Sequence, residues 1–319
     1  MNVDYLRISV TDRCNLQCVY CNPLGCCQVT QSDEVLIAEE IKRAVRLLVD
    51  CGIRKVRITG GEPLVREDIV ALVGELAGVD GIEDLSLTTN GVFLGALAPE
   101  LKAAGLQRVN VSVDSMDRHT YKRISGFDLL PSVVGGVHKA MEVGLTPVKI
   151  NSVVIKGLND SDEQIAALAE MSVRLPVAVR FIEYYPTNTH TRPAADYVPN
   201  RMVRTIIERW FGPLSGAVMA PGNGPALYFK IRDSAGAIGF ISGRSSIFCH
   251  SCSRLRLTSS GKLMPCLYSA RTYDLGTLMR NDATDEQIRD FVKVILSEKN
   301  RFTKSNSFKE EFSMCGVGG

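Results

Sequence analysis

Six short segments in the first 185 residues alternate apolar and polar side chains, and this pattern constrains the fold most strongly. Strict alternation is typical of a β-strand with one buried face. Segments with helical spacing lie between them, which predicts a parallel sheet joined by right-handed crossovers. The predicted strands are Tyr5–Val10, Lys55–Thr59, Leu85–Thr89, Gln107–Asp114, Val148–Val154 and Val177–Glu183.

The first crossover helix is predicted over Asp33–Cys51, with Ser32 as its N-cap and Gly52 just past its end. Later helices follow the same helical spacing of apolar residues. They are predicted near Glu67–Ala77 and over Leu97–Ala104, Pro131–Val143 and Asp162–Val173.

The polar faces of the predicted strands carry four cations, Arg7, Arg57, Lys149 and Arg180. A parallel sheet covered on both faces is apolar on both, and a closed barrel is filled with apolar side chains. The alternation instead favours an incomplete barrel with a polar lumen. Buried cations need an anionic ligand or inward carboxylates, and Arg suits phosphate. The alternative is that these are exposed residues of ordinary amphipathic strands.

Pro193 and Pro199 indicate a linker over Thr187–Asn200, which predicts domains 1–195 and 196–319. The second part is expected to be α+β. Its predicted elements are a helix over Arg201–Phe211, strands near Ala226–Ile231 and Ala237–Ser242, and helices over Leu275–Arg280 and Asp285–Lys299.

The charge balance is nearly neutral, with 37 Lys+Arg against 35 Asp+Glu, so no nucleic-acid partner is expected. No apolar run approaches the roughly 20 residues that a membrane helix needs, so no membrane partner is expected either. Charged residues between Asp4 and Arg13 interrupt any signal peptide, and we expect a cytoplasmic protein. Ten cysteines in such a protein are not a disulfide framework.

Three of these cysteines, Cys14, Cys18 and Cys21, directly follow the first strand, where barrel enzymes place their sites. Three thiolates suit a [4Fe-4S] cluster with one iron left open, since such a cluster normally takes four cysteines. A zinc site with a fourth ligand elsewhere is the alternative. The four histidines, His119, His138, His190 and His250, all lie far from this group in the sequence.

A second group comprises Cys249, Cys252 and Cys266. Its spacing is equally typical of a zinc knuckle completed by His250 or Cys315. Arg254 and Arg256 alternate after Cys252, so both face one side of an extended segment and suit phosphate or a base. A solvated basic strand is the alternative. The remaining thiols, Cys26, Cys27, Cys51 and Cys315, have no assigned role.

The motif Cys-x3-Cys-x2-Cys with Tyr20, followed by Gly60-Gly61-Glu62-Pro63, resembles the radical S-adenosylmethionine superfamily. Further segments resemble one family within it, the GTP 3′,8-cyclases (MoaA family) of molybdenum cofactor biosynthesis. They are LRISVTDRCN (6–15), VRITGGEPLVR (56–66), TTNG (88–91), RVNVSVD (108–114), IKGLND (155–160), RFIEYYP (180–186), FCHSCSRLRLTSSGKLMPCL (248–267) and the terminal GG.

The resemblance implies an incomplete (β/α)6 barrel, similar to a TIM barrel, with a C-terminal cysteine-containing domain closing its mouth. It also implies two [4Fe-4S] clusters, one on each cysteine group, the second binding the guanine. S-adenosylmethionine contacts carry over to Tyr20, Gly61, Ser112 and Tyr185. GTP contacts carry over to Arg7, Arg57, Thr88, Lys149, Arg254, Leu255 and Arg256. No catalytic residue is expected beyond the cofactor ligands.

The implied reaction begins with reductive cleavage of S-adenosylmethionine. The resulting radical takes the 3′ hydrogen of GTP, and the ribose radical attacks C8 to give 3′,8-cyclo-7,8-dihydro-GTP. The Gly318-Gly319 tail is implied to enter the active site. An electron donor is an expected partner, and the next enzyme of the pathway and a second copy of the chain are candidate partners.

Some positions depart from the family pattern. Asn22 and Tyr185 stand where Met is usual, and the stretches Pro23–Gln28 and Thr187–Arg192 differ. These changes concern the shape of the adenosyl pocket. The competing functions are a related radical enzyme acting on a peptide, and a zinc-stabilised binding module without catalysis.

Overall fold

The computed structural model describes residues 3–23, 34–186, 191–217, 224–246, 252–267, 269, 271–299 and 314–317. In these residues one sheet of twelve strands runs in the order β12-β11-β10-β1-β2-β3-β4-β5-β6-β9-β8-β7. The first six strands along the chain are neighbours in sequence order, and each pairs in parallel with the next. They are β1 (Tyr5–Ser9), β2 (Lys55–Thr59), β3 (Asp84–Thr89), β4 (Arg108–Ser112), β5 (Lys149–Val154) and β6 (Ala178–Glu183).

The C-terminal part of the chain extends both edges of this sheet. β10 (Arg254–Leu257) pairs in parallel with β1, and β9 (Ala237–Ile241) pairs in parallel with β6. Antiparallel strands continue outward on each side: β11 (Lys262–Met264) and β12 (Tyr273–Asp274), then β8 (Leu227–Lys230) and β7 (Ser215–Gly216). The sheet is therefore open, ending at β12 and β7.

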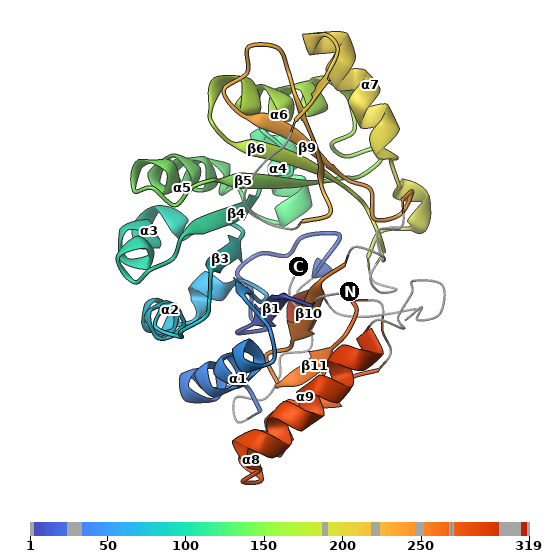
Figure 1. The fold of residues 1–319 in the computed structure, drawn as a ribbon. Helices are drawn as coiled ribbons and strands as arrows, with labels where there is room; N and C mark the ends of the chain where they lie inside the picture. The colour runs from blue at the N-terminus through green and yellow to red at the C-terminus, as the bar shows by residue number, and fades with distance from the viewer. Residues whose placement is uncertain are drawn as a thin grey trace.

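The crossover helices follow one side of the sheet. Figure 1 shows α1, α2, α3 and α5 in succession beside the strands that they connect. The helices are α1 (Ala38–Asp50), α2 (Ile69–Ala77), α3 (Leu94–Ala103), α4 (Arg118–Ser125), α5 (Leu130–Glu142), α6 (Asp162–Arg174), α7 (Asn200–Phe211), α8 (Leu275–Arg280), α9 (Asp285–Lys299) and α10 (Met314–Val317), with 3-10 turns at Pro63–Val65 and Ala194–Asp196. None of the described helices is long and apolar enough to span a bilayer.

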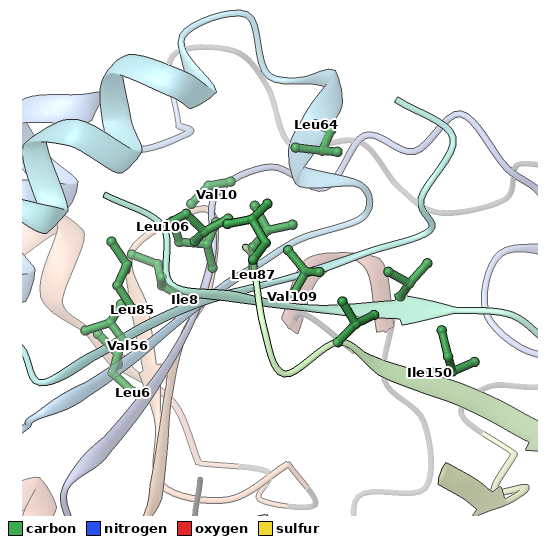
Figure 2. Packing of buried hydrophobic residues seen from close by; sticks show 14 of the residues in the cluster. Leu6, Ile8, Val10, Val56, Leu64, Leu85, Leu87, Leu106, Val109 and Ile150 are labelled. Atoms are coloured by element: carbon green, nitrogen blue, oxygen red, sulfur yellow. The ribbon is translucent and has the colours of Figure 1, made fainter. Parts of the chain in front are cut away.

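The hydrophobic core lies between the helices and the apolar face of the strands. Leu6, Ile8, Val56 and Leu87 have no exposed surface and belong to one buried cluster, which Figure 2 shows from close by. Fully burying such a side chain contributes about 1.5–3 kcal/mol. The apolar face predicted from alternation is thus confirmed, and the opposite face remains free for polar side chains.

The start of α1 differs from the prediction. Ser32 and Asp33 lie outside the described residues, and the helix begins at Ala38 rather than near Asp33. The chain is still extended at Ile37, and the Leu36 amide donates to the carbonyl of Ser259 at 2.8 Å. The Glu40 carboxylate accepts a hydrogen bond from the Ile37 amide at 3.0 Å, which satisfies one backbone donor at the start of the helix.

Helix α4 was not predicted. Asp117 caps it by accepting the Thr120 amide at 2.8 Å, and Gly126 ends it with a φ of 89°. Its apolar residues are too few to show a clear period in eight residues.

The fold prediction is confirmed at the level of an open α/β sheet. The parallel run holds eight strands instead of six because β9 and β10 join it from the C-terminal part. The sequence predicted β9 as a strand near Ala237–Ser242, but it did not predict that β9 and β10 join the parallel sheet, because their partner strands are distant in the chain.

Candidate active site

A cavity of about 340 Å³ lies along the polar face of the parallel strands. Every strand from β1 to β6 contributes lining residues, as do β10 and the loops that follow the strands. Its lining includes Tyr5, Arg7, Cys14, Cys18, Tyr20, Cys21, Arg57, Gly60, Gly61, Thr88, Asn90, Ser112, Asp114, Lys149, Asn151, Arg180, Glu183, Tyr184, Tyr185, Arg254, Arg256, Leu267 and Met314. The four cations predicted to face a lumen, Arg7, Arg57, Lys149 and Arg180, are all among them.

Three arginines form a row across the sheet. Arg7 of β1 is in register with Arg256 of β10 on one side and with Arg57 of β2 on the other. Neighbouring strands lie about 4.8 Å apart, so three like charges stand in adjacent positions on one face. Such a row favours an anion with several charged oxygens.

The electrostatics of the cavity follow from this crowding. Burial, together with the positive charge of Arg180 and Arg108, lowers the pKa of Lys149 to about 7. Burial likewise lowers the pKa of Arg57 to about 10. For Arg7, burial and the neighbouring Arg256 hold the pKa well below its usual value. A polyanion in the cavity would relieve these penalties.

Two aromatic rings support the buried cations. The Arg57 guanidinium lies 5.4 Å from the centre of the Tyr5 ring, and the Lys149 ammonium 6.0 Å from that of Tyr228. Cation–π contacts of this kind stabilise a desolvated charge. Sequence reasoning missed both rings, although Tyr5 shares a strand face with Arg7.

The carboxylate of Asp84 forms an ion pair with a fifth cation, Arg108. Asp84 accepts the Arg108 Nε at 2.8 Å and makes a second hydrogen bond to its Nη2. Both residues are buried, and Arg108 is in register with Ser86, the strand neighbour of Arg57, so the pair is a neutral unit that continues the arginine row. Sequence reasoning missed this pair: alternation around Ser86 and Asn110 places both residues on the polar face, but only the strand register brings them together.

The first cysteine group lies at one end of the cavity. Cys14, Cys18 and Cys21 all line it and are free thiols. The Leu16 amide donates to the Cys14 sulfur at 3.5 Å, a contact that stabilises a thiolate. Burial raises the pKa of Cys14 and raises that of Cys18 well above its usual range, so a cationic centre is needed to hold them as thiolates.

No trio of His, Cys, Asp or Glu within the described part of the chain converges on a single metal ion. A [4Fe-4S] cluster does not require such convergence, because each cysteine binds a different iron of the cube. Three thiols lining one cavity, with an amide on one sulfur, fit a cluster better than a zinc ion.

The glycine-rich turn after β2 approaches the cysteine loop closely. A Cβ on Gly61 would lie 2.3 Å from the carbonyl oxygen of Arg13, and one on Gly60 would lie 2.5 Å from that of Thr11. Glycine is required here because any side chain would push the segment before Cys14 away.

Glu62 ties this turn to the next strand. Its buried carboxylate accepts the Thr89 hydroxyl at 2.7 Å, the Asn90 amide at 2.6 Å and the Leu64 amide at 3.0 Å. Burial raises its pKa to about 7, against those hydrogen bonds. Asn90 in turn donates to Asn15, next to Cys14, at 2.7 Å.

The side chain of Tyr20 contacts the segment that follows β4. Its hydroxyl donates to Asp114 at 2.8 Å, and Asp114 also accepts the Val153 amide at 2.8 Å. Burial raises the pKa of Asp114 to about 6. Ser112 and Tyr185 line the same cavity, so the four residues predicted to contact S-adenosylmethionine lie together there.

The second cysteine group is described in part. Cys249 lies outside the described residues, whereas Cys252 and Cys266 are free thiols. Burial acts to raise the pKa of Cys252, but the charges of Arg254 and Lys299 outweigh it and lower the pKa to about 7. Neither sulfur lines the cavity, although Arg254 and Leu267 beside them do.

Leu255 was expected to contact GTP, and its side chain is fully buried in the hydrophobic core between Arg254 and Arg256. Any contact with a ligand at this position therefore comes from its backbone. The side chain sets the strand face instead, because its burial directs both flanking arginines toward the cavity.

The end of the chain approaches the cavity. Arg256 donates to the Val317 carbonyl at 3.1 Å, and Val317 packs with Met264 in a small apolar cluster that Tyr185 and Met314 also touch. Gly318 and Gly319, expected in the active site, lie outside the described residues, as do Cys26 and Cys27.

Glu183 at the end of β6 was not predicted. One oxygen accepts the Asn200 amide at 3.1 Å and the Ser245 hydroxyl at 2.6 Å. The other accepts the amides of Arg244 and Ser245 at 3.0 and 2.8 Å. It therefore anchors the segment that precedes the second cysteine group.

Comparison with known proteins agrees with this geometry. Residues 8–169 match the Radical SAM superfamily model, and residues 177–305 match the model named Molybdenum Cofactor Synthesis C. GTP 3′,8-cyclase of Pelotomaculum thermopropionicum is 41% identical over 99% of this chain and 98% of its own length. The chain belongs to the GTP 3′,8-cyclase family.

Other members of this family are equally similar over their full length. The cyclase of Moorella thermoacetica is 40% identical, covering 99% of this chain and 98% of that protein. Among solved structures, S-adenosylmethionine-bound SuiB of Streptococcus suis has a TM-score of 0.62 at 17% identity, covering 91% of this chain and 68% of that one. Methylornithine synthase has a TM-score of 0.50 at 20% identity, covering 66% and 63%. These likenesses show that the fold is shared, while the superfamily follows from the model that residues 8–169 match.

Proposed function

We propose that this chain is a GTP 3′,8-cyclase that converts GTP to 3′,8-cyclo-7,8-dihydro-GTP, the first step of molybdenum cofactor biosynthesis. The observation that carries the proposal is one cavity with three thiols at one end and a row of Arg256, Arg7 and Arg57 along its wall. The thiols suit a cluster that cleaves S-adenosylmethionine, and the cations suit a triphosphate. A peptide substrate would leave the arginine row without a counter-charge.

The chain's own residues bind, orient and exclude water. Cys14, Cys18 and Cys21 would hold the first [4Fe-4S] cluster, which would supply the electron for reductive cleavage of S-adenosylmethionine. Tyr20, Gly61, Ser112 and Tyr185 would hold S-adenosylmethionine beside it. The cavity walls would fix the separation of the reacting carbon atoms. They would also exclude water, which prevents side reactions.

The substrate end would combine both parts of the chain. Thr88 and Lys149, with the arginine row, would hold the triphosphate, and Arg254 with the Leu255 backbone would flank the base. Cys249, Cys252 and Cys266 would hold a second [4Fe-4S] cluster, which would supply a binding site for the guanine. The position of Arg254 and Leu267 on the cavity wall beside the two described thiols supports this arrangement.

The proposal assigns a role to each part of the fold. Residues 1–195 would form the six-stranded partial barrel, and residues 196–319 would close its mouth. We place the enzyme in the cytoplasm, where an electron donor must reach it, and we treat a homodimer and the next enzyme of the pathway as partners to be tested.

Anaerobic purification followed by iron and sulfide analysis tests the cofactor content. Two clusters give about eight irons per chain, whereas a zinc-stabilised binding module gives none. Incubation with a reductant, S-adenosylmethionine and GTP should then yield the cyclised nucleotide. Absence of this product, with both clusters present, would overturn the assigned reaction.

Two variants separate the cofactor from the substrate. Cys14→Ser should abolish cleavage of S-adenosylmethionine. Arg256→Ala should mainly impair GTP conversion, since Arg256 belongs to the arginine row that would hold the triphosphate. Normal cleavage by Cys14→Ser would contradict the first cluster, and calorimetric GTP binding separates this function from a peptide-modifying one.

A further inference from the structure

Lys299, the last residue of α9, is a buried lysine with 6% of its surface exposed. Its ammonium donates to the carbonyl of Pro265 at 2.6 Å and lies 3.6 Å from the Cys252 sulfur. Pro265 directly precedes Cys266. One cation thus contacts two separate segments of the chain, each carrying a cysteine of the second group.

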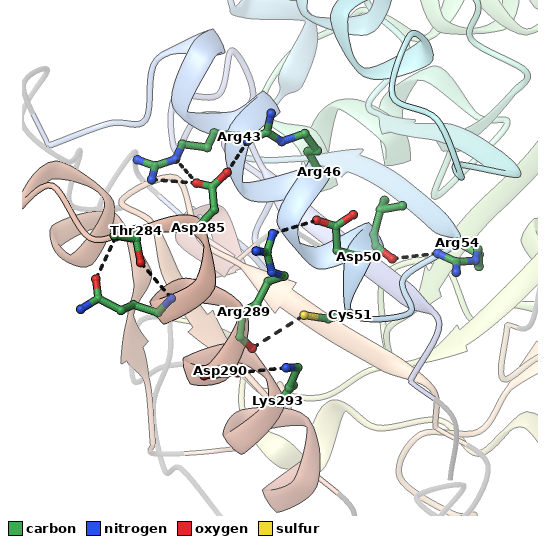
Figure 3. Close-up of polar contacts among 12 residues, drawn as sticks. Arg43, Arg46, Asp50, Cys51, Arg54, Thr284, Asp285, Arg289, Asp290 and Lys293 are labelled. Atoms are coloured by element: carbon green, nitrogen blue, oxygen red, sulfur yellow. Dashed lines mark hydrogen bonds and ion pairs between the residues drawn. The ribbon is translucent and has the colours of Figure 1, made fainter.

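The position of Lys299 is set by how α9 is held. At the start of the helix, Asp285 accepts Arg43 at 2.9 Å and Arg46 at 2.6 Å, both from α1. One turn on, Arg289 pairs with Asp50 at 3.3 Å, as Figure 3 shows. The buried stripe Ile288, Val292 and Ile295 continues along the helix. These contacts fix α9 along its length, and its last residue, Lys299, therefore lies beside Cys252.

A buried ammonium is costly unless a negative group lies beside it. Among the described residues, no carboxylate lies within ion-pairing distance of Lys299, and the Cys252 sulfur is its contact with ionisable character. The Lys299 ammonium is therefore placed against the sulfur that the proposed second cluster would use, and a cluster there would supply the negative charge that this buried cation lacks among the described residues.

We propose that Lys299 is a positioning residue for the second cluster: it holds the Cys252 and Cys266 segments together and raises the reduction potential of the cluster they bind. The proposal rests on the proposed function, which supplies that cluster. A nearby positive charge and an N–H···S contact favour the more negative, reduced form, and hydrogen bonds to sulfur are a known determinant of cluster potential.

The test compares Lys299→Met and Lys299→Gln with the control Lys293→Met. Lys293 lies on the same helix but is exposed and pairs with Asp290. All are made in a chain whose Cys14, Cys18 and Cys21 are replaced by alanine, so that the second cluster is observed alone. The readouts are iron and sulfide content after anaerobic reconstitution, and the reduction potential from an EPR-monitored titration.

We expect both Lys299 variants to shift the potential to more negative values, with Lys299→Met also losing iron faster on exposure to a chelator. A role in packing alone would change iron retention but leave the potential where it is. If Lys299→Met does not fold, Lys299→Gln gives the same reading, because it removes the charge while keeping a donor.

Potentials equal to that of the Lys293→Met control would overturn the inference and leave the proposed function intact. If the background protein with native Lys299 takes up no iron at all, the second cluster is absent. That result would overturn both this inference and the proposed role of the second cysteine group.

Discussion

At the scale of single residues, the cavity keeps charges where the ligand-free protein would be more stable without them. Arg57 is buried, donates to Ser86 at 3.2 Å and stands in register with Arg7. Burial lowers the pKa of Arg57, because the charged form is less favourable inside the protein than in water. Binding sites commonly sacrifice stability in this way for function.

Arg57→Met is therefore expected to stabilise the ligand-free protein by about 1–3 kcal/mol, because an apolar side chain of similar length removes a buried charge. The same change should weaken GTP binding. Urea unfolding with and without GTP measures both effects. A variant less stable than the wild type without GTP would show that the charge is already compensated.

The lowered pKa of Lys149 leads us to expect that GTP binding depends on pH. Its pKa of about 7 lies below the usual 10.5, so the ligand-free cavity releases this proton as pH rises through 7. A bound triphosphate requires the charged form, and binding must then take up a proton. The affinity should fall by up to about tenfold per pH unit above 7.

Calorimetry at pH 8 in two buffers of different ionisation heat measures this proton uptake. Lys149→Met should bind GTP more weakly, with the extra proton uptake absent. Equal uptake by the variant and the wild type would assign the proton to another group.

Gly61→Ala tests the close approach of the glycine-rich turn to the cysteine loop. The added methyl would meet the Arg13 carbonyl, so the segment leading into Cys14 must move. We expect loss of the first cluster, which halves the iron from about eight to about four per chain. The control is Gly74→Ala on α2, where nothing lies within 4 Å and iron content should be unchanged.

At the scale of elements, α1 and α9 are joined by charged side chains that come from opposite ends of the sequence. Arg43 and Arg46 converge on Asp285, and Arg280 of α8 pairs with Glu40 at 2.7 Å. Arg43 and Asp285 remain about one-third exposed, with side-chain values of 32% and 36%. Such pairs contribute modestly one by one, and more as a network.

Asp285→Ala should lower the free energy of unfolding by about 1 kcal/mol, with a smaller effect at high salt. A double-mutant cycle with Arg43→Ala isolates the pair, and urea unfolding is the measurement. Strict additivity of the two substitutions would mean that the contact contributes nothing.

At the scale of the whole molecule, the C-terminal part completes the sheet as well as the site. β10 covers the edge of β1 and β9 covers that of β6, so both open edges of the six-stranded core depend on residues beyond 195. Gly236 shows how tight the second junction is: a Cβ there would lie 2.0 Å from the Val177 carbonyl oxygen.

A chain ending at residue 195 should therefore fail to give a folded monomer, because unpaired edges of buried strands associate with one another. Size-exclusion chromatography and circular dichroism of the truncated chain, beside the full-length protein, check this. A monomeric, folded product would show that the two parts are independent domains.

Local pattern was enough to predict the six strands, most crossover helices and the direction of Arg7, Arg57, Lys149 and Arg180, since a period of two assigns each side chain to a face. The motifs around Cys14, Cys18 and Cys21 were likewise sufficient for the reaction class.

What only the tertiary structure decided involves residues far apart in the chain. The row of Arg256, Arg7 and Arg57, the pairing of Asp84 with Arg108, and the reach of Lys299 to Cys252 all depend on strand register and helix packing. Periodicity cannot supply these, because it reports the environment of each residue and not the identity of its neighbours.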